Sequence, residues 1–275
     1  MTASNGRMPT LYIPHGGGPS FFMKPGETLG PEGTWDAQAA YLRGLAASLG
    51  TKPKAVLVIS AHWEERKPTV NTQATPGMLF DYYGFPDYTY QLKYPAPGQP
   101  ELAKRVRDLL GKAGIESNEE TARGFDHGVF IPFMLVYPEA DMPIVELSLV
   151  ANLDAATHLA IGRALAPLRD EGVLIVGSGM SYHNLRAMMS GDPRGDAAAA
   201  RFDAWLTETL EDADTKARDA RLMDWQKAPE GLASHPRPEH LLPLHVVAGA
   251  AGADRGKRTY ADKVLGKAQS GFRFG

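Results

Sequence analysis

The stretch AVLVISAHW, residues 55–63, decides the fold that this chain can adopt. Its first five residues are apolar and rich in β-branched side chains, which is typical of a central strand in a parallel sheet buried on both faces. The strand runs out through Ser60 toward His62. Open α/β sheets bind ligands beyond the carboxyl ends of their strands, so His62 is a candidate site residue.

Two further apolar runs end in the same way. Residues 11–13 lead into a proline, His15 and three consecutive glycines, whereas residues 173–176 lead through a Gly-Ser-Gly turn toward His183. Glycine lets the backbone approach a ligand closely. Histidines that follow three buried strands therefore indicate a binding site at one edge of the sheet.

The spacing of apolar residues along the rest of the chain predicts strands alternating with amphipathic helices. A further strand is expected over residues 144–149, and helices over residues 35–49, 100–113, 130–137, 155–169, 197–210 and 239–250. The last helix has His240 in its first turn, and the charged residues 212–221 are expected in a solvated helix face or loop. This alternation predicts an α/β fold with a central, mostly parallel or mixed sheet and helices on both faces. No repeat or linker divides residues 1–275, so a single domain is expected.

The composition and the charge of the chain exclude several kinds of binding partner and of chemistry. The chain has 275 residues, a net charge of −3 and no cysteine. No basic cluster is present to bind nucleic acid, and disulfides, thiolate metal ligands and a cysteine nucleophile are excluded. Residues 1–10 lack the apolar region of a signal peptide, and no apolar run approaches the roughly 20 residues of a membrane span. A cytoplasmic protein without membrane association is therefore expected, and no segment marks an interface between subunits.

Five of the eight histidines lie in short motifs rich in glycine or proline, where a strand ends or a turn begins. They are His15, His62, His127, His183 and His240. Histidine is the commonest metal ligand and the usual acid or base near neutral pH. Several histidines that converge at strand ends are what a metal-dependent α/β enzyme requires.

The remaining histidines and one nearby carboxylate have structural explanations. His158 and His245 lie inside predicted helices and are expected to be structural. His235 and His240 flank a Pro-Arg-Pro-Glu loop, whose two prolines make it stiff, and only one of the two need bind a metal. Glu239 either supplies a carboxylate to the site or complements the dipole at a helix start.

Three other polar residues stand next to the histidine motifs. Asp126 either orients another group or caps the helix that follows it. Asn184 is expected to be a turn or capping residue. Ser181 could be a nucleophile, but a serine nucleophile in an α/β-hydrolase needs a Gly-x-Ser-x-Gly turn, which this chain lacks.

Residues 75–98 form a long segment that is rich in aromatic and turn-forming residues. Long irregular segments inside a compact domain are usually functional. The rings of this segment either wall an aromatic pocket or cover one end of the sheet.

The motifs taken together, in order, resemble one known family. They are HGGGP (residues 15–19), SAHW (60–63), YPAPG (94–98), GFDHG (124–128), HNLR (183–186) and PEHLLPL (238–244). Each motif is weak alone, but the combination resembles the DOPA 4,5-dioxygenase group of the class III, LigB-type extradiol ring-cleavage dioxygenases. The resemblance extends from about residue 9 to the last predicted helix.

The resemblance implies a reaction and a metal site. The reaction is cleavage of a catechol ring beside its two hydroxyls, with O2 and a non-haem Fe(II). By motif, His15, His62 and His240 correspond to the metal ligands. Since the third ligand of the wider class is a glutamate and is a histidine here, Zn(II) also suits the site. His183 is either a fourth ligand or a free acid/base.

The resemblance also implies roles for the remaining two histidines. A base with a pKa near 7 best removes the catechol protons, and His183 is the first choice if it does not bind the metal. His127 matches a histidine that contacts substrate or bound oxygen, and it takes the acid/base role if His183 is a ligand. A DOPA-like or caffeate-like substrate would need a cation, for which Arg186 or Arg237 could serve.

Three rival functions use the same residues. A zinc-dependent hydrolase or lyase could use the same histidine site without O2. An α/β-hydrolase could use the HGGG stretch as an oxyanion loop, although the missing serine motif argues against it. A binding protein without activity is disfavoured by the intact set of five histidines.

Overall fold

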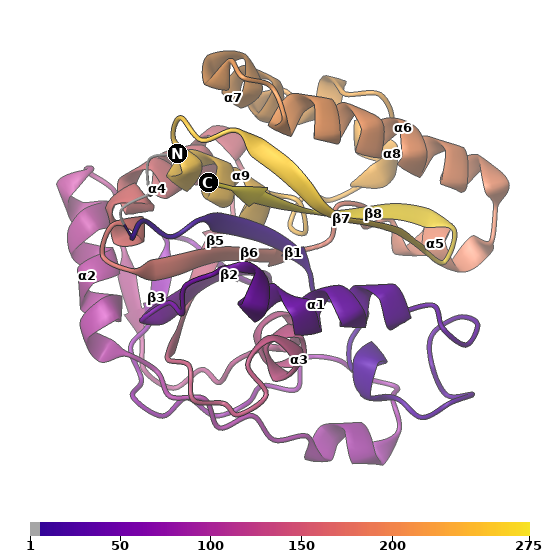
Figure 1. Cartoon of the computed structure of the whole chain (residues 1–275), viewed down its shortest axis with the longest axis horizontal. Coiled ribbons are helices and arrows are strands. Elements are labelled where there is room, and N and C mark those ends of the chain that lie inside the picture. Colours follow the sequence, from indigo (N-terminus) through magenta and orange to yellow (C-terminus); the bar gives the residue numbers. More distant parts are fainter. Residues whose placement is uncertain (1–5) are drawn as a thin grey trace.

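An eight-stranded mixed sheet forms the middle layer of the protein (Figure 1). The computed structural model describes residues 6–275. The strand order is β4-β3-β5-β2-β6-β1-β8-β7, in which β2 pairs in parallel with β5 and β6, and β1 pairs in parallel with β6. The strands are β1 (Thr10–Pro14), β2 (Ala55–Glu65), β3 (Thr69–Asn71), β4 (Asn118–Glu120), β5 (Ile144–Val150), β6 (Val173–Gly179), β7 (Gly256–Val264) and β8 (Lys267–Phe274).

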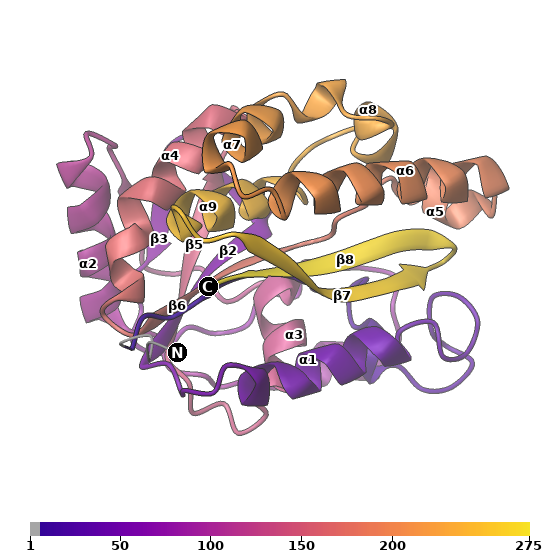
Figure 2. The same cartoon turned by 45° about the horizontal axis from the view of Figure 1, so that its top comes forward.

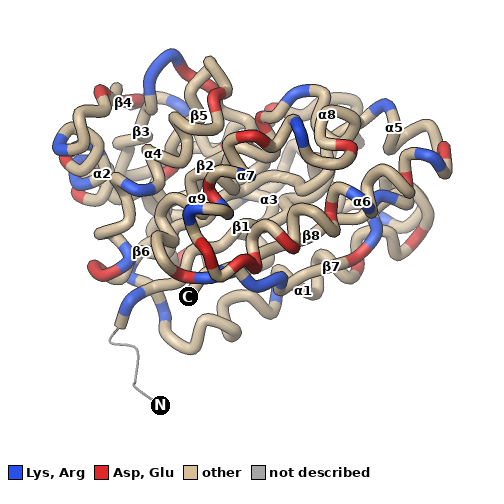
Figure 3. The backbone as a smooth tube through the Cα atoms, turned by 90° about the horizontal axis from the view of Figure 1, so that it is seen from above, with Lys and Arg blue, Asp and Glu red and all other residues tan. Residues whose placement is uncertain are grey.

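Helices cover both faces of this sheet, as the sequence predicts (Figures 1 and 2). On one face lie α1 (Asp36–Ser48) and α3 (His127–Val136). The opposite face is covered by α2 (Pro100–Lys112), α4 (Ala155–Leu165) and α9 (Leu242–Ala251), with α6 (Pro193–Leu210), α7 (Thr215–Met223) and α8 (Gly231–Ser234) beside them. The short helix α5 (Leu185–Ser190) lies near the far end of the β7–β8 hairpin. Acidic and basic residues are interspersed along α6 and α7 (Figure 3).

The side chains of β2 explain why the sheet is covered on both faces. Leu57 and Ile59 point into the hydrophobic cluster formed with α2, α4 and α9. Val56 and Val58 point into the second cluster, formed with α1 and α3. Successive side chains of a strand face opposite sides, so a continuous apolar run needs cover on both. The prediction of a strand buried on both faces is confirmed.

The strand β2 is longer than predicted, and His62 lies within it rather than beyond its end. Ile59 pairs with Leu147 of β5, but the next paired residues are Glu64 and Leu149. Five steps along β2 therefore match two steps along β5, which makes a large bulge over residues 60–63. Bulges re-aim side chains and often adjoin active sites. This bulge carries His62.

Several predicted boundaries need correction. The helix α9 begins at Leu242, so His240 lies in the turn before it and not in its first turn. The helix α3 already begins at His127, and α6 begins at Pro193, a favourable first helical position. The predicted helix over residues 155–169 ends at Leu165 and continues as a 3-10 turn.

The charged segment 212–221 also differs from the prediction of a wholly solvated element. Most of it belongs to α7, but Arg218 is buried and donates hydrogen bonds to the carbonyls of Ala248, Gly252 and Asp254. The guanidinium thereby satisfies carbonyl groups at the carboxyl end of α9. A buried charge of this kind requires such partners. Because these partners are distant in the sequence, the spacing of apolar residues could not predict that Arg218 is buried.

The C-terminal hairpin β7–β8 was not predicted. The strand β8 pairs antiparallel with β1, and β7 forms the outer edge of the sheet. The sequence of β7, GKRTYADKV, carries four charged residues, and most of its side chains are exposed. Charged side chains are common on edge strands because they prevent pairing with other chains, but they hide the strand from a search for apolar runs. Within residues 6–275, no helix is long and apolar enough to cross a membrane.

Candidate active site

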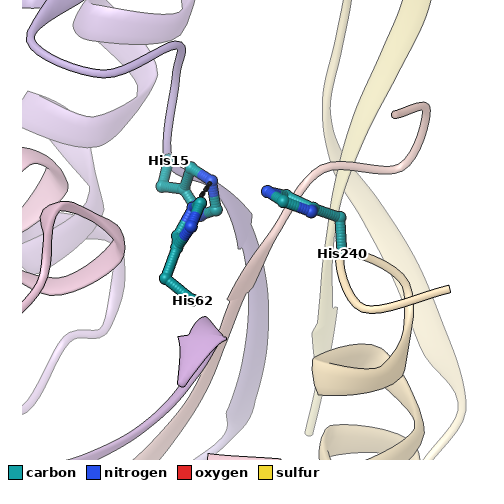
Figure 4. Close-up of side chains that lie close together, drawn as sticks. All are labelled: His15, His62 and His240. Carbon is teal, nitrogen blue, oxygen red and sulfur yellow. Dashed lines mark hydrogen bonds between the residues drawn. The ribbon is translucent and has the colours of Figure 1, made fainter. Parts of the chain in front are cut away.

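Three predicted histidines meet at the carboxyl edge of the sheet (Figure 4). His15 follows β1, His62 lies on the bulge of β2, and His240 comes from the turn before α9. One ring nitrogen from each lies within 4.8 Å of the other two. Only 1% of His15 and 4% of His240 is exposed. Segments that are far apart in sequence thus present three imidazoles to one point.

Contacts from β1 and from the end of β6 hold His240 in place. The hydroxyl of Tyr12 donates a hydrogen bond of 2.6 Å to the carbonyl of His240, and the amide of Met180 donates one of 3.2 Å to the same oxygen. A Cβ atom on Gly179 would lie 2.1 Å from that oxygen. Only glycine at position 179 therefore allows the turn that carries His240 to pack against the end of β6.

We expect Gly179→Ala to displace His240 and to lower the free energy of unfolding by about 1–3 kcal/mol, the usual cost of overpacking. Gly44→Ala is the matched control, because no atom lies within 4 Å of its added Cβ and alanine favours the interior of α1 by about 0.5–1 kcal/mol. Urea denaturation and metal titration of both variants measure these effects. Wild-type stability and metal affinity in Gly179→Ala would contradict this explanation of the packing.

Hydrogen bonds fix the tautomer of His15. The Ser178 hydroxyl donates its hydrogen to the carbonyl of Gly128. The same hydroxyl oxygen lies 3.0 Å from Nδ1 of His15 and must accept a hydrogen bond there. His15 therefore carries its hydrogen on Nδ1, and its Nε2 presents a lone pair to the site.

Asp81 orients two more histidines. Its Oδ1 lies 2.7 Å from Nδ1 of His127 and accepts a second hydrogen bond of 3.0 Å from the amide of the same residue. Its Oδ2 lies 3.6 Å from Nδ1 of His62, which favours the hydrogen on that nitrogen. Burial alone would raise the pKa of Asp81, but the hydrogen bond from His127 and the charge of that ring leave it lowered. Asp81 is thus an anion that directs both Nε2 atoms into the site.

Glu239 has the same relation to His183 and His240. Its Oε1 lies 3.1 Å from Nδ1 of His183 and 2.9 Å from Nδ1 of His240. Burial opposes ionisation, but the hydrogen bond from His183 leaves the pKa of Glu239 lowered. The carboxylate therefore accepts hydrogen from both rings, and their Nε2 atoms remain free. The prediction that Glu239 serves the site is consistent with this position behind the two rings.

The donor set fits a metal ion. Burial, assisted by the neighbouring histidines, lowers the pKa of His15, His62 and His240 well below the usual value, so the three rings are neutral. The Nε2 atoms of His15 and His62 lie 3.1 Å apart, within hydrogen-bond distance of each other (Figure 4). Two nitrogens bound at about 2.1 Å to one ion would be about 3.0–3.4 Å apart. The spacing therefore suits a bound ion in place of this hydrogen bond, and histidine ligands held at Nδ1 by an acceptor are usual in metal sites.

The other two predicted histidines flank this group. The ring of His127 lies against His62, with centroids 3.9 Å apart, and the ring of His183 stacks on His240 at 3.3 Å. Among the described residues, His183 groups with Glu239 and His240, and His127 groups with His62 and Asp81. Neither belongs to the group formed by the other three histidines. All five predicted residues therefore come together in one site.

His158 and His245, which are expected to be structural, bond backbone groups, and so does His235. His235 is buried, bonds the carbonyl of Ser181, and has its pKa lowered by burial to about 3. His158 accepts a hydrogen bond from the amide of Val150 and donates one to the carbonyl of Asp154, and Nε2 of His245 lies 2.9 Å from the carbonyl of Leu222. Each of these rings thus satisfies buried backbone groups.

The polar residues beside the motifs have defined partners. The side chain of Asn184 caps α5, as predicted. Asp126 makes no side-chain capping bond; instead it accepts hydrogen bonds from Ser60 and Arg123, which stabilises the bulge that carries His62. Ser181 is buried and bonds Gln269 and Ser270 of β8. A serine held in this way is not positioned as a nucleophile.

Two functional groups of the site were missed by sequence reasoning. Asp81 lies 46 residues before the histidine that it orients, and Ser178 lies at the end of a strand as one of many serines. The one available signal for Asp81 is its place in the long aromatic segment 75–98. Tyr83 and Phe85 of that segment line the cavity over the histidines, while the ring of Phe80 packs against Tyr90 and against Phe130 of α3. The segment therefore walls a pocket, and its other rings pack on a helix.

A cavity of about 350 Å³ opens onto the five histidines. Its size falls within the range of small-ligand sites. Its walls come from the glycine loop after β1, the aromatic segment, α5 and the tip of the β7–β8 hairpin. An α/β sheet that carries a group of buried histidines beneath such a cavity is typical of metal-dependent enzymes that act on small molecules. The fold and the site define this class of protein.

Comparisons with known proteins agree with this class. Residues 9–272 match the family described as the catalytic LigB subunit of aromatic ring-opening dioxygenase. A 4,5-DOPA dioxygenase extradiol of Beta vulgaris is 48% identical over 203 residues, which cover 73% of this chain and 74% of that protein. The dioxygenase tasH of Hapsidospora irregularis is 38% identical over 277 residues, covering 95% and 83%. The crystal structure of an uncharacterised protein of Escherichia coli K12 has a TM-score of 0.77 and 31% identity, covering 98% of this chain and 100% of that one.

The chain belongs to the LigB family, within the group of the 4,5-DOPA extradiol dioxygenases. Its reaction class is therefore oxidative, extradiol cleavage of an aromatic ring, with an aromatic molecule and O2 as the small-molecule partners. The predicted resemblance is confirmed over almost the whole length of the chain.

Proposed function

We propose that the chain cleaves a catechol beside its two hydroxyls at a metal held by His15, His62 and His240. The observation that supports this proposal most strongly is the convergence of three neutral imidazoles at the base of the cavity, with one ring nitrogen of each within 4.8 Å of the other two. Three protein ligands on one side of an ion leave room for other molecules on the opposite side.

The metal that we propose is Fe(II). When bound, it would supply adjacent open positions for the catechol oxygens and O2. Three neutral imidazoles also suit Zn(II), so the metal that supports turnover identifies the native one. The position of His183, outside the group of the other three ring nitrogens within 4.8 Å, supports an acid/base role over that of a fourth ligand.

We propose that His183 and His127 transfer protons and stabilise charge during the reaction. His183 accepts a catechol proton at Nε2, since its Nδ1 hydrogen is bonded to Glu239. The carboxylate then stabilises the resulting imidazolium, and the same nitrogen returns the proton as the ring opens. His127, whose Nδ1 hydrogen is bonded to Asp81, takes up the second catechol proton at Nε2 and then donates a hydrogen bond from that nitrogen to the oxygen that becomes an anion.

The experiment that tests this function is oxygen uptake by protein loaded anaerobically with Fe(II), with unsubstituted catechol as the substrate. We expect one O2 consumed per catechol and a yellow ring-opened product. The same protein loaded with Zn(II) is the control and should consume no O2. Metal-loaded protein that leaves every catechol intact and hydrolyses esters would replace the proposal with the zinc hydrolase. The cytoplasmic location stays a prediction based on the absence of cysteine.

A further inference from the structure

We infer that the substrate is a catechol whose ring substituent is uncharged and apolar. This inference rests on the proposed function, since it assumes that the catechol hydroxyls lie at the histidines. It comes from the walls of the cavity, where the remainder of the substrate would lie. A catechol that bears a carboxylate requires a cation in these walls, whereas the walls are mainly apolar.

The inner walls are aromatic and packed directly on the glycine loop. A Cβ atom on Gly17 would lie 3.1 Å from the ring of Trp35, and one on Gly18 would lie 2.9 Å from the ring of Phe85. Gly18 also has a positive φ of 56°, which glycine adopts without strain. The glycines that follow His15 therefore let two large rings close over the loop as apolar walls beside the metal ligands.

The mouth of the cavity is apolar as well. Tyr83, Leu185 and Met189 line it and are 91%, 59% and 68% exposed. Among the described residues, Met223 and Leu232 are the other large apolar side chains that are exposed, and neither lines the cavity. Apolar side chains gathered in this way at one opening mark a ligand-binding surface.

No lysine or arginine lines this cavity within the described part of the chain. Arg237, one of the two cations that could serve a substrate carboxylate or be structural, forms a bidentate pair with Glu64 at 2.6 and 2.5 Å and also contacts Glu239. Arg186 is exposed on α5 and is absent from the lining. Apart from the histidines, the ionisable groups of the lining are the acidic Asp81 and the phenol of Tyr83.

A carboxylate on the substrate would therefore lose water without gaining a counterion. Burial of an unpaired charge is strongly unfavourable, whereas an alkyl or ester group gains from contact with apolar walls. The cavity thus selects for neutral substituents. The methionines of α5 suit substituents of varied shape, because their side chains adapt to irregular surfaces.

The test compares caffeate with its methyl ester, which share one skeleton and differ in charge. With Fe(II)-loaded protein, we expect kcat/KM for methyl caffeate to exceed that for caffeate by at least about 10-fold, because the acid buries an unpaired carboxylate. L-DOPA should be cleaved as poorly as caffeate. Equal or faster cleavage of the two charged substrates would overturn the inference.

A second experiment introduces a cation into the cavity by substitution. Met189→Lys places an ammonium at the mouth of the cavity, on an exposed position that tolerates it. We expect this variant to shift the ratio of kcat/KM toward caffeate by about 5-fold, as an exposed ion pair would. Met223→Lys, an exposed methionine outside the cavity, is the matched control and should leave the ratio unchanged. An unchanged ratio in Met189→Lys would place the substituent elsewhere and overturn the inference.

Unsubstituted catechol separates the two proposals. If neither ester, acid nor catechol consumes O2, the proposed function fails and the inference fails with it. If catechol is cleaved and the charged substrates match the ester, the function stands and the inference about the substituent alone is overturned.

Discussion

Replacement of His62 by alanine is expected to abolish ring cleavage through loss of the metal. Metal-binding free energies of sites with histidine and cysteine ligands are on the order of 10 kcal/mol. Removal of one of three proposed ligands should therefore weaken binding by roughly 3 kcal/mol, or about 100-fold. Once unbound metal has been removed by gel filtration, we expect the variant to lose its metal, and ring cleavage with it, because binding is about 100-fold weaker.

The measurement is metal content after gel filtration, together with oxygen uptake on catechol. His158→Gln is the matched control, because that ring is buried and bonds backbone groups outside the site. The control variant should keep the metal stoichiometry of the wild type even if it is less stable. A circular dichroism spectrum verifies that His62→Ala is folded. Folded His62→Ala that binds metal as tightly as the wild type would remove His62 from the ligand set.

The strands that carry the site could be predicted, because they are buried on both faces. Residues 55–59 and 173–176 are continuous apolar runs, and they became the centres of β2 and β6. The hairpin β7–β8 could not be found in this way. Its edge strand faces solvent along most of its length, so it lacks both a continuous apolar run and a regular alternation.

The candidate site, too, could be predicted from the sequence only in part. The five histidines could be predicted because each lies in a glycine- or proline-rich motif near a strand end or turn. The carboxylate of Asp81 could not, since a hydrogen bond to Nδ1 constrains position in space and leaves no spacing in the sequence, whereas Glu239 could, because it is adjacent to His240 in the sequence. Asp81 orients His127 and His62 from an irregular segment. The pairing of Arg237, one of the two cations that could serve a substrate carboxylate, with Glu64 leaves no trace in the sequence either.

Replacement of His127 by asparagine is expected to remove catalysis while the metal remains bound. The asparagine amide can donate to Asp81 as Nδ1 does in the wild type, so the local fold should persist. What the variant lacks is Nε2, the atom proposed to stabilise the oxygen anion. Loss of one such donor costs about 10²–10³ in kcat.

The readouts are kcat and KM on catechol, with metal content measured on the same sample. We expect kcat to fall by about 10²–10³, with KM and metal content close to those of the wild type, because His127 lies outside the three-histidine group. Asp81→Asn is a milder change, because the variant keeps Nε2 of His127 and loses only the anion behind the ring. We therefore expect kcat to decrease by about 10-fold in this variant. Loss of metal from His127→Asn would instead assign His127 to the ligand set with His62 and Asp81. Full activity with metal retained would show that its Nε2 takes no part in the reaction.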